Sequence, residues 1–226
     1  MLRRVQLMRP FIYSAVLLTL FSMTSLLAQV RKGQWTPGVD NSERGYASIA
    51  YWTYRDDGVE IAGGRITLDY GRPAWRAQWA DEAAFDQLTK GRIWRLGKDM
   101  WTNLDTQLAL TVAGKKVDPG YYYLGARRSP GGDWSLVLVD PEAVRGGYID
   151  AWAFVPRPDE VPILMEIPLK HSQSAETASQ LNMTLELPKH GQGVKDEGRL
   201  TIHWGPHLLQ ADFKISVPPP GFYKER

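Results

Sequence analysis

Tryptophan and arginine are concentrated in residues 72–101, and together these residue types could bind a ligand. The members of this cluster are Arg72, Trp75, Arg76, Trp79, Arg92, Trp94, Arg95 and Trp101. Flat apolar rings beside forked cations suit stacking on a sugar or an aromatic molecule, while arginine pairs with carboxylate or phosphate. Tryptophan also fills the cores of β-sandwiches, so a purely structural role is the alternative.

Arg95 belongs to the short strand Ile93-Trp94-Arg95-Leu96, where it points to the side opposite Trp94. If its side chain is buried, it must be paired, because an unpaired buried charge costs several kcal/mol. The nearest acids in the sequence are Asp69, Asp99 and Asp105. If Arg95 is the buried residue, we expect one or more of them to pair with it, in a network that could be purely structural.

Histidine, the usual residue of metal and acid–base chemistry, offers a weak signal. His203 and His207 flank a Gly-Pro pair in HWGPH, and both could approach one ion from two strands of a hairpin. No nearby acid completes a ligand set, so two solvent-facing histidines are favoured. We expect no metal and no cofactor.

Signatures of nucleophilic catalysis are absent from the sequence. There is no G-x-S-x-G elbow, no Ser-x-x-Lys, no phosphate-cradling Gly-rich loop and no cysteine. The acid pairs Asp56-Asp57, Asp81-Glu82 and Asp196-Glu197 are typical of turns or helix caps. A glycoside hydrolase with two carboxylates facing across a cleft remains the alternative to a non-enzymatic module.

The first residues have the pattern of an export signal. MLRRVQLMRP carries three arginines and no acid, and the apolar run FIYSAVLLTLFSM precedes the small-residue stretch TSLLA. This order predicts a signal peptide over residues 1–28 that is cleaved after Ala28 and is too short for a comfortable membrane span; an uncleaved N-terminal anchor is the alternative. We therefore expect a periplasmic or secreted protein whose mature chain has no membrane span.

The charge of the mature chain gives no reason to expect a nucleic-acid partner. Loss of Arg3, Arg4 and Arg9 with the signal reduces the 27 basic residues to 24, against 25 acidic ones. The basic excess of the full chain therefore belongs to the export signal.

Alternation of apolar and polar residues predicts the elements that must position these side chains. Turn residues interrupt the pattern every eight to twelve positions, which indicates a two-sheet antiparallel sandwich, jelly-roll-like, of about ten strands. The expected strands lie at 46–54, 65–70, 93–96, 106–112, 121–126, 134–139, 148–154, 162–169, 182–187, 199–204 and 208–217, with a hairpin at Gly205-Pro206 joining the last two.

One short helix is expected over residues 79–91. Asp81 can cap it, Ala84, Phe85 and Leu88 lie on its apolar stripe, and Gly91 ends it. The expected organisation is a lead-in at 29–44, a single domain at 45–217 and a tail at 218–226.

Five motifs follow one another along the chain: DYGRP (69–73), IWRLGKDMWT (93–102), AGKKVDPGYYYL (113–124), WSLVLVD (134–140) and LTIHW (200–204). Their order resembles the bacterial exported family catalogued as domain of unknown function 2911. The family pattern has Arg-Pro, then Trp-Arg-x-Gly-x-Asn-x-x-Thr, then Gly-x-Tyr. Matching positions are Arg72, Pro73, Trp94, Arg95, Gly97, Thr102, Gly120 and Tyr122 or Tyr121. Asp99 departs from the family's Asn, which would alter the selectivity of any polar site.

The resemblance implies a compact exported β domain in which Arg72, Trp94, Arg95 and Asp99 form one polar cluster at a sheet end. Together with the tryptophan and arginine cluster, the resemblance suggests a non-enzymatic binding module. Arg72, Arg95 and Asp99 would bind the polar groups of a ligand, and Trp75 and Trp101 would contact its apolar part. The candidate ligand-binding residues are Arg72, Trp75, Trp94, Arg95, Asp99, Trp101 and Thr102. The expected partner is a small molecule, a glycan or an envelope protein; a structural role in the envelope is a further alternative.

Overall fold

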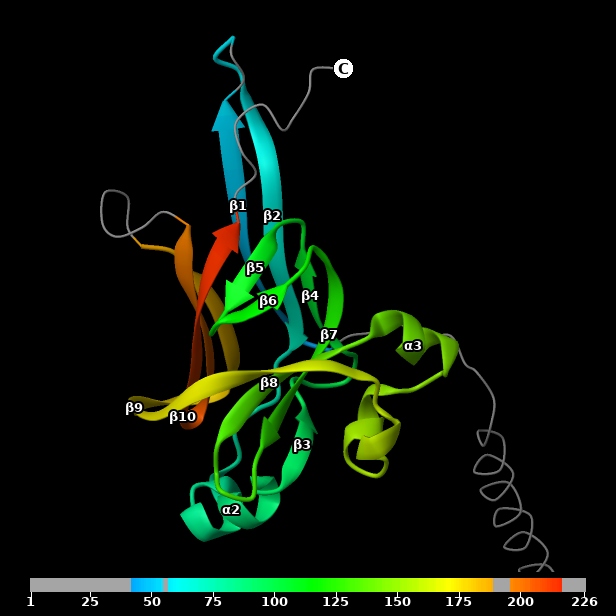
Figure 1. Cartoon of the computed structure of the whole chain (residues 1–226). Coiled ribbons are helices and arrows are strands. Elements are labelled where there is room, and N and C mark those ends of the chain that lie inside the picture. The colour runs from blue at the N-terminus through cyan, green and yellow to red at the C-terminus, as the bar shows by residue number, and fades with distance from the viewer. Residues whose placement is uncertain (1–41, 55–56, 189–195, 217–226) are drawn as a thin grey trace, which may run out of the picture. The chain divides into compact units, whose positions relative to one another are not determined.

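The computed structural model describes residues 42–54, 57–188 and 196–216 (Figure 1). The expected signal peptide, most of the lead-in and the tail at 218–226 lie outside these ranges, as does His190. In the described part of the chain, no helix combines the length and apolar character needed to cross a membrane.

Antiparallel strands dominate the described residues, which confirms the all-β prediction. The strands are β1 (Arg44–Tyr54), β2 (Glu60–Gly71), β3 (Arg92–Arg95), β4 (Thr102–Thr106), β5 (Ala109–Val112), β6 (Lys115–Val117), β7 (Gly120–Arg128), β8 (Trp134–Val139), β9 (Ile163–Glu186) and β10 (Glu197–Ser216). The helical elements are α2 (Glu82–Thr89), α3 (Pro141–Gly146) and the 3₁₀ turns η1 (Ala77–Trp79), η2 (Ala151–Phe154) and η3 (Pro158–Glu160).

The strands form two layers that belong to one hydrogen-bonded sheet. Their order is β1-β2-β4-β7-β8-β9-β10-β5-β6, and β3 pairs with the second half of β7. The long strand β9 connects the layers: residues 163–169 pair with β8, and residues 170–186 pair with β10 (Figure 1). The sandwich is therefore a single sheet that folds over along β9.

The main core fills the space between the layers. It includes Leu68, Leu124 and Ile167 from the first layer and Met183 from the second, each at most 1% exposed. The Tyr70 hydroxyl of β2 accepts the backbone N–H of Met183 at 2.9 Å, so the layers are also joined by a buried hydrogen bond. Burial of these side chains is the dominant stabilisation of such a fold.

A second apolar cluster lies on the other face of the first layer. Val137 and Val139 of β8 pack there against Val144, Phe154 and Val161 from the segment that follows β8. Residues 148–154 were expected to be a strand, and this prediction was wrong. Asp140 caps α3 and Asp150 caps η2, so these carboxylates satisfy the first backbone N–H groups of helical turns instead.

The expected helix over 79–91 forms as α2. Asp81 accepts the N–H of Ala84 at 2.8 Å, as expected of its cap. Gly91 follows with a φ of 69°, the left-handed conformation that glycine adopts at low cost.

The expected hairpin at Gly205-Pro206 was also wrong. Strand β10 runs without a turn from Glu197 to Ser216, and its pairing with β9 shifts register on both sides of Gly205. Gly205 has a φ of 58°, and a Cβ atom there would lie 2.3 Å from the ring of Trp75. Gly205 thus forms an irregularity in a continuous strand, and only glycine lets the Trp75 ring approach so closely.

We predict that Gly205→Ala lowers the free energy of unfolding by about 3 kcal/mol, because it adds a steric clash to backbone strain. Gly114→Ala is the matched control: Gly114 has a φ of 80° but nothing within 4 Å of a Cβ. Strain alone should cost the control about 1 kcal/mol. Urea unfolding of both variants checks this, and equal losses would contradict the close packing of Trp75 on Gly205.

Candidate functional site

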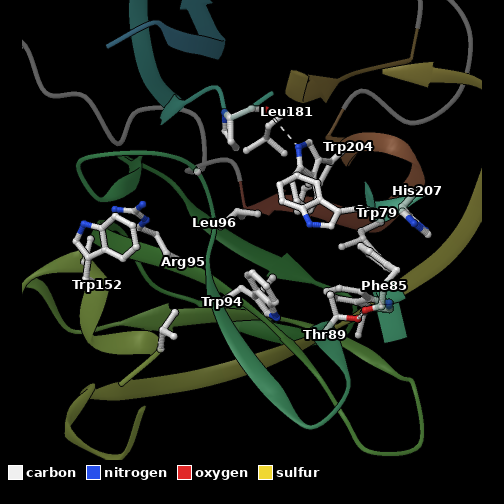
Figure 2. A pocket seen from close by; sticks show the side chains of 18 residues that line it. Trp79, Phe85, Thr89, Trp94, Arg95, Leu96, Trp152, Leu181, Trp204 and His207 are labelled. Atoms are coloured by element: carbon white, nitrogen blue, oxygen red, sulfur yellow. Dashed lines mark hydrogen bonds between the residues drawn. The ribbon is translucent and has the colours of Figure 1, made fainter. Parts of the chain in front are cut away.

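A cavity of about 300 Å³ opens between the layers (Figure 2). Its wall is mainly apolar, with six tryptophan or phenylalanine residues: Trp79, Phe85, Trp94, Trp134, Trp152 and Trp204. Aliphatic residues from both layers complete it, among them Ala126 of β7, Leu181 of β9 and Leu209 of β10. Thr89, Arg95 and His207 are the lining residues with polar side-chain groups beyond the indoles.

Helix α2 is fixed against the first layer by a buried arginine of β7. The guanidinium of Arg128 lies 2.7 Å from both Asp86 Oδ1 and the Thr89 hydroxyl. It also lies over the rings of Phe85 and Trp134, at 5.7 and 5.4 Å from their centroids. Asp86 also binds Lys90 at 2.5 Å, and these contacts together fix α2 to β7 at this end of the cavity.

A tryptophan cluster fixes the segment between β2 and α2 against β10. The ring of Trp75 lies 5.6 Å from that of Trp79 and 5.0 Å from that of Trp204, with edge-to-face geometry in both pairs. Trp204 donates its indole N–H to the carbonyl of Pro73 at 3.2 Å. Edge-to-face packing is the favoured geometry for such rings. The cluster holds Trp79 and Trp204 in the cavity wall.

Arg95 lies at one end of the cavity, beside Trp152 (Figure 2). Its guanidinium carbon is 4.4 Å from the Trp152 ring centroid, and Nη1 donates to the backbone carbonyl of Asp99 at 2.7 Å. Burial lowers the pKa of Arg95, an effect opposed at longer range by Asp99 and Asp150.

The acids expected to pair with Arg95 do not form ion pairs with it. Asp69 binds Arg44 at 2.8 Å, and the Asp99 carboxylate lies 3.5 Å from Lys98. Asp99 reaches Arg95 through its main chain, whose φ of 61° is left-handed. Within the described residues, no carboxylate oxygen lies within 4 Å of Arg95.

Of the other residues expected at the site, only Trp94 lines the cavity. Trp75 contacts the lining residues Trp79 and Trp204 but does not line the cavity itself. Arg72 pairs with Glu43 at 2.8 Å and donates to the carbonyl of Leu181 at 3.3 Å. The structure therefore does not bring Arg72, Trp94, Arg95 and Asp99 into one hydrogen-bonded cluster.

Trp101 and Thr102 lie elsewhere. Trp101 stacks on Tyr123 at 4.8 Å, in the cluster on the other face of the first layer. Thr102 is fully buried, and its hydroxyl donates to the carbonyl of Leu96. This bond holds the loop after β3 to the start of β4, and so helps to fix the backbone next to Arg95.

His207, which was expected to face solvent, lies in the cavity wall. Its ring stacks on Phe85 with 4.1 Å between centroids, and its Nδ1 is 3.1 Å from Nε2 of His171. Burial, together with His171 and Arg128, lowers the pKa of His207 to about 4. Among the described residues, no group of three or more His, Cys, Asp or Glu is arranged to hold a metal ion.

The sequence contained a signal for the position of His207. Before Gly205 the inward residues have even numbers, Leu200 and Ile202; after it they have odd numbers, Leu209 and Ala211. His207 is in phase with the second set. The change of phase was interpreted as a hairpin, whereas the irregularity at Gly205 produces it within one strand.

A comparison with family models matches residues 56–213 to the family described as "Protein of unknown function (DUF2911)". The chain belongs to this family. The DUF2911 match includes every residue that lines the cavity, from Pro73 to Leu209. Neither a curated protein nor a solved structure matches the chain.

We predict that stability falls as the pH drops from about 6.5 towards 4. His207 stays neutral in the folded state over this range, whereas an unfolded histidine gains a proton near pH 6.5, so acid favours unfolding. The lowered pKa of His171 acts in the same direction.

Urea unfolding at pH 7.5, 6 and 5 checks this, with His207→Gln expected to show a shallower loss. His203→Gln is the control, because His203 lies on the same strand, does not line the cavity, and its Nε2 lies 3.2 Å from the exposed carbonyl of Glu176. If the free energy of unfolding of His207→Gln depends on pH as steeply as that of the wild type, the pH dependence does not come from His207.

Proposed function

We propose that this DUF2911 domain is a binding module that holds a small, largely apolar molecule in the cavity between its layers. The observation that carries the proposal is the cavity itself, an aromatic space of about 300 Å³ that several residues of the main core line. Ligand pockets range from about 300 to 1,000 Å³ and are mainly apolar with few polar groups. Unfilled space in a core costs stability, because the surrounding atoms lose contacts.

The composition of the wall supports an apolar small molecule over a glycan. A sugar needs many hydrogen-bonding partners, and the wall offers few beyond Arg95, Thr89 and His207. The indole Nε1 atoms of Trp94 and Trp134 are buried without a hydrogen-bond partner among the described residues. Because these nitrogens are covered by protein atoms, they add no accessible hydrogen-bond donor for a sugar.

The wall also supports binding over hydrolysis. None of the lining residues is Asp or Glu, so this cavity offers no pair of carboxylates for glycoside chemistry. His207, the one lining histidine, stacks on Phe85 and is held neutral by burial. Together with the signal peptide expected from the sequence, these features lead us to propose an exported, periplasmic or secreted, binding module.

Titration of the full chain with the fluorescent neutral probe N-phenyl-1-naphthylamine tests the proposal. We predict a saturable rise in fluorescence with one site per chain. Ala126→Leu should weaken binding at least about tenfold, since Ala126 lines the cavity and three added carbons would occupy part of the space that the probe needs. Thermal melting confirms that the variant is folded.

Ala143→Leu is the control. It makes the same substitution at an exposed position of α3 that does not line the cavity. A wild-type protein that shows no saturable binding, or a folded Ala126→Leu variant that binds as tightly as the control, would contradict the proposed function.

A further inference from the structure

We propose that the cavity selects amphipathic anions, molecules with an apolar body and one carboxylate or similar group, and that Arg95 pairs with the anionic group. This inference rests on the proposed function and names the class of ligand. The apolar body would lie among the tryptophans, with its charged end beside Trp152.

The charges of the wall are the first argument. Arg95 is the one lining residue that carries a formal charge at neutral pH, since His207, with a pKa of about 4, is then neutral. Arg128 and Arg72, which contact lining residues, form ion pairs with Asp86 and Glu43 at 2.7 and 2.8 Å, and Arg76 lies over the Trp79 ring without lining the cavity itself. Arg95 therefore gives this cavity a net positive end.

The hydrogen bonds of Arg95 are the second argument. Among the described residues its guanidinium donates one hydrogen bond, from Nη1 to the carbonyl of Asp99. A guanidinium has five N–H donors in a planar fork that matches the two oxygens of a carboxylate. Arg95 is partly buried and has no ion pair among the described residues, so an anionic ligand would offset the cost of its partial desolvation.

The position of Arg95 is the third argument. Trp152 and Val155 line the cavity, yet they are 63% and 61% exposed, so they lie where it meets solvent. Figure 2 shows Arg95 beside Trp152 at this side, while Trp79, Phe85 and His207 lie at the opposite side. A bound amphiphile can therefore bury its apolar body while its anionic group stays near water, which lowers the desolvation cost of the charge.

Displacement of N-phenyl-1-naphthylamine by octanoate and by 1-octanol tests this inference, because the two ligands share a chain length and differ at the end group. We measure the ratio of their displacing concentrations for wild type, Arg95→Met and Arg95→Lys. Loss of a charge-assisted pair should shift the ratio against octanoate by about tenfold or more in Arg95→Met. Arg95→Lys should be intermediate, since lysine keeps the charge without the fork.

Arg92→Met is the matched control. Arg92 lies on the same strand, is exposed and does not line the cavity, so its loss removes an equal charge from the surface only. A shift in Arg95→Met no larger than that of the control overturns the anion preference. So does an equal weakening of both ligands, which would make Arg95 part of the scaffold.

The outcomes separate this inference from the proposed function. If the neutral probe binds and octanoate shows no dependence on Arg95, the binding module stands and the anion preference fails. If the neutral probe does not bind the wild-type protein, both fail. Thermal melting of each variant shows whether a loss reflects unfolding, and Arg95→Lys provides the test if Arg95→Met does not fold.

Discussion

The packing of Trp75 on Gly205 is the contact on which the cavity depends. Gly205 leaves the regular strand conformation, and the absence of a side chain lets the Trp75 ring cover the backbone of β10. The same irregularity changes the phase of β10, which brings both Trp204 and His207 to the inner side. One glycine thus determines two parts of the wall and the position of the segment that carries Trp79.

The second constraint is the continuity of the sheet through β9. A strand that pairs with β8 in one layer and with β10 in the other holds the layers together along one edge. The segment that carries the tryptophan cluster binds β9 directly, because the N–H of Trp75 donates to the carbonyl of Ser179 at 2.8 Å, and the cavity lies beside this contact. The cavity is therefore a consequence of large rigid rings that cannot close completely over one another.

Local patterns predicted much of this fold. Alternating residues placed most strands, and Asp81 with Gly91 marked the ends of α2, because these signals depend on nearby residues. Gly205-Pro206 was wrongly predicted to be a hairpin turn, because glycine and proline occur both in turns and at irregularities within a strand. Residues 148–154 were wrongly predicted to be a strand. Their apolar residues are buried from a 3₁₀ turn, and over so few residues the spacing of apolar positions does not distinguish such a turn from a strand.

The candidate site was harder to predict, because its members come from five strands, helix α2 and several turns. The tryptophan and arginine cluster did contain Trp94 and Arg95, and Trp79 lay within the same stretch. Trp134, Trp152 and His207 are distant in the sequence, and no local pattern connects them. Arg95 was expected to pair with a carboxylate; its partner is instead a carbonyl, which residue types cannot reveal.

The most direct test of the central claim, that the cavity binds a small amphiphile, is an NMR titration that follows the indole N–H signals of the tryptophans with octanoate. The account predicts shifts for Trp94, Trp134, Trp152 and Trp204, which line the cavity, and little change for Trp52, which is exposed on β1. Shifts confined to Trp52, or no saturable shift at all, would contradict it.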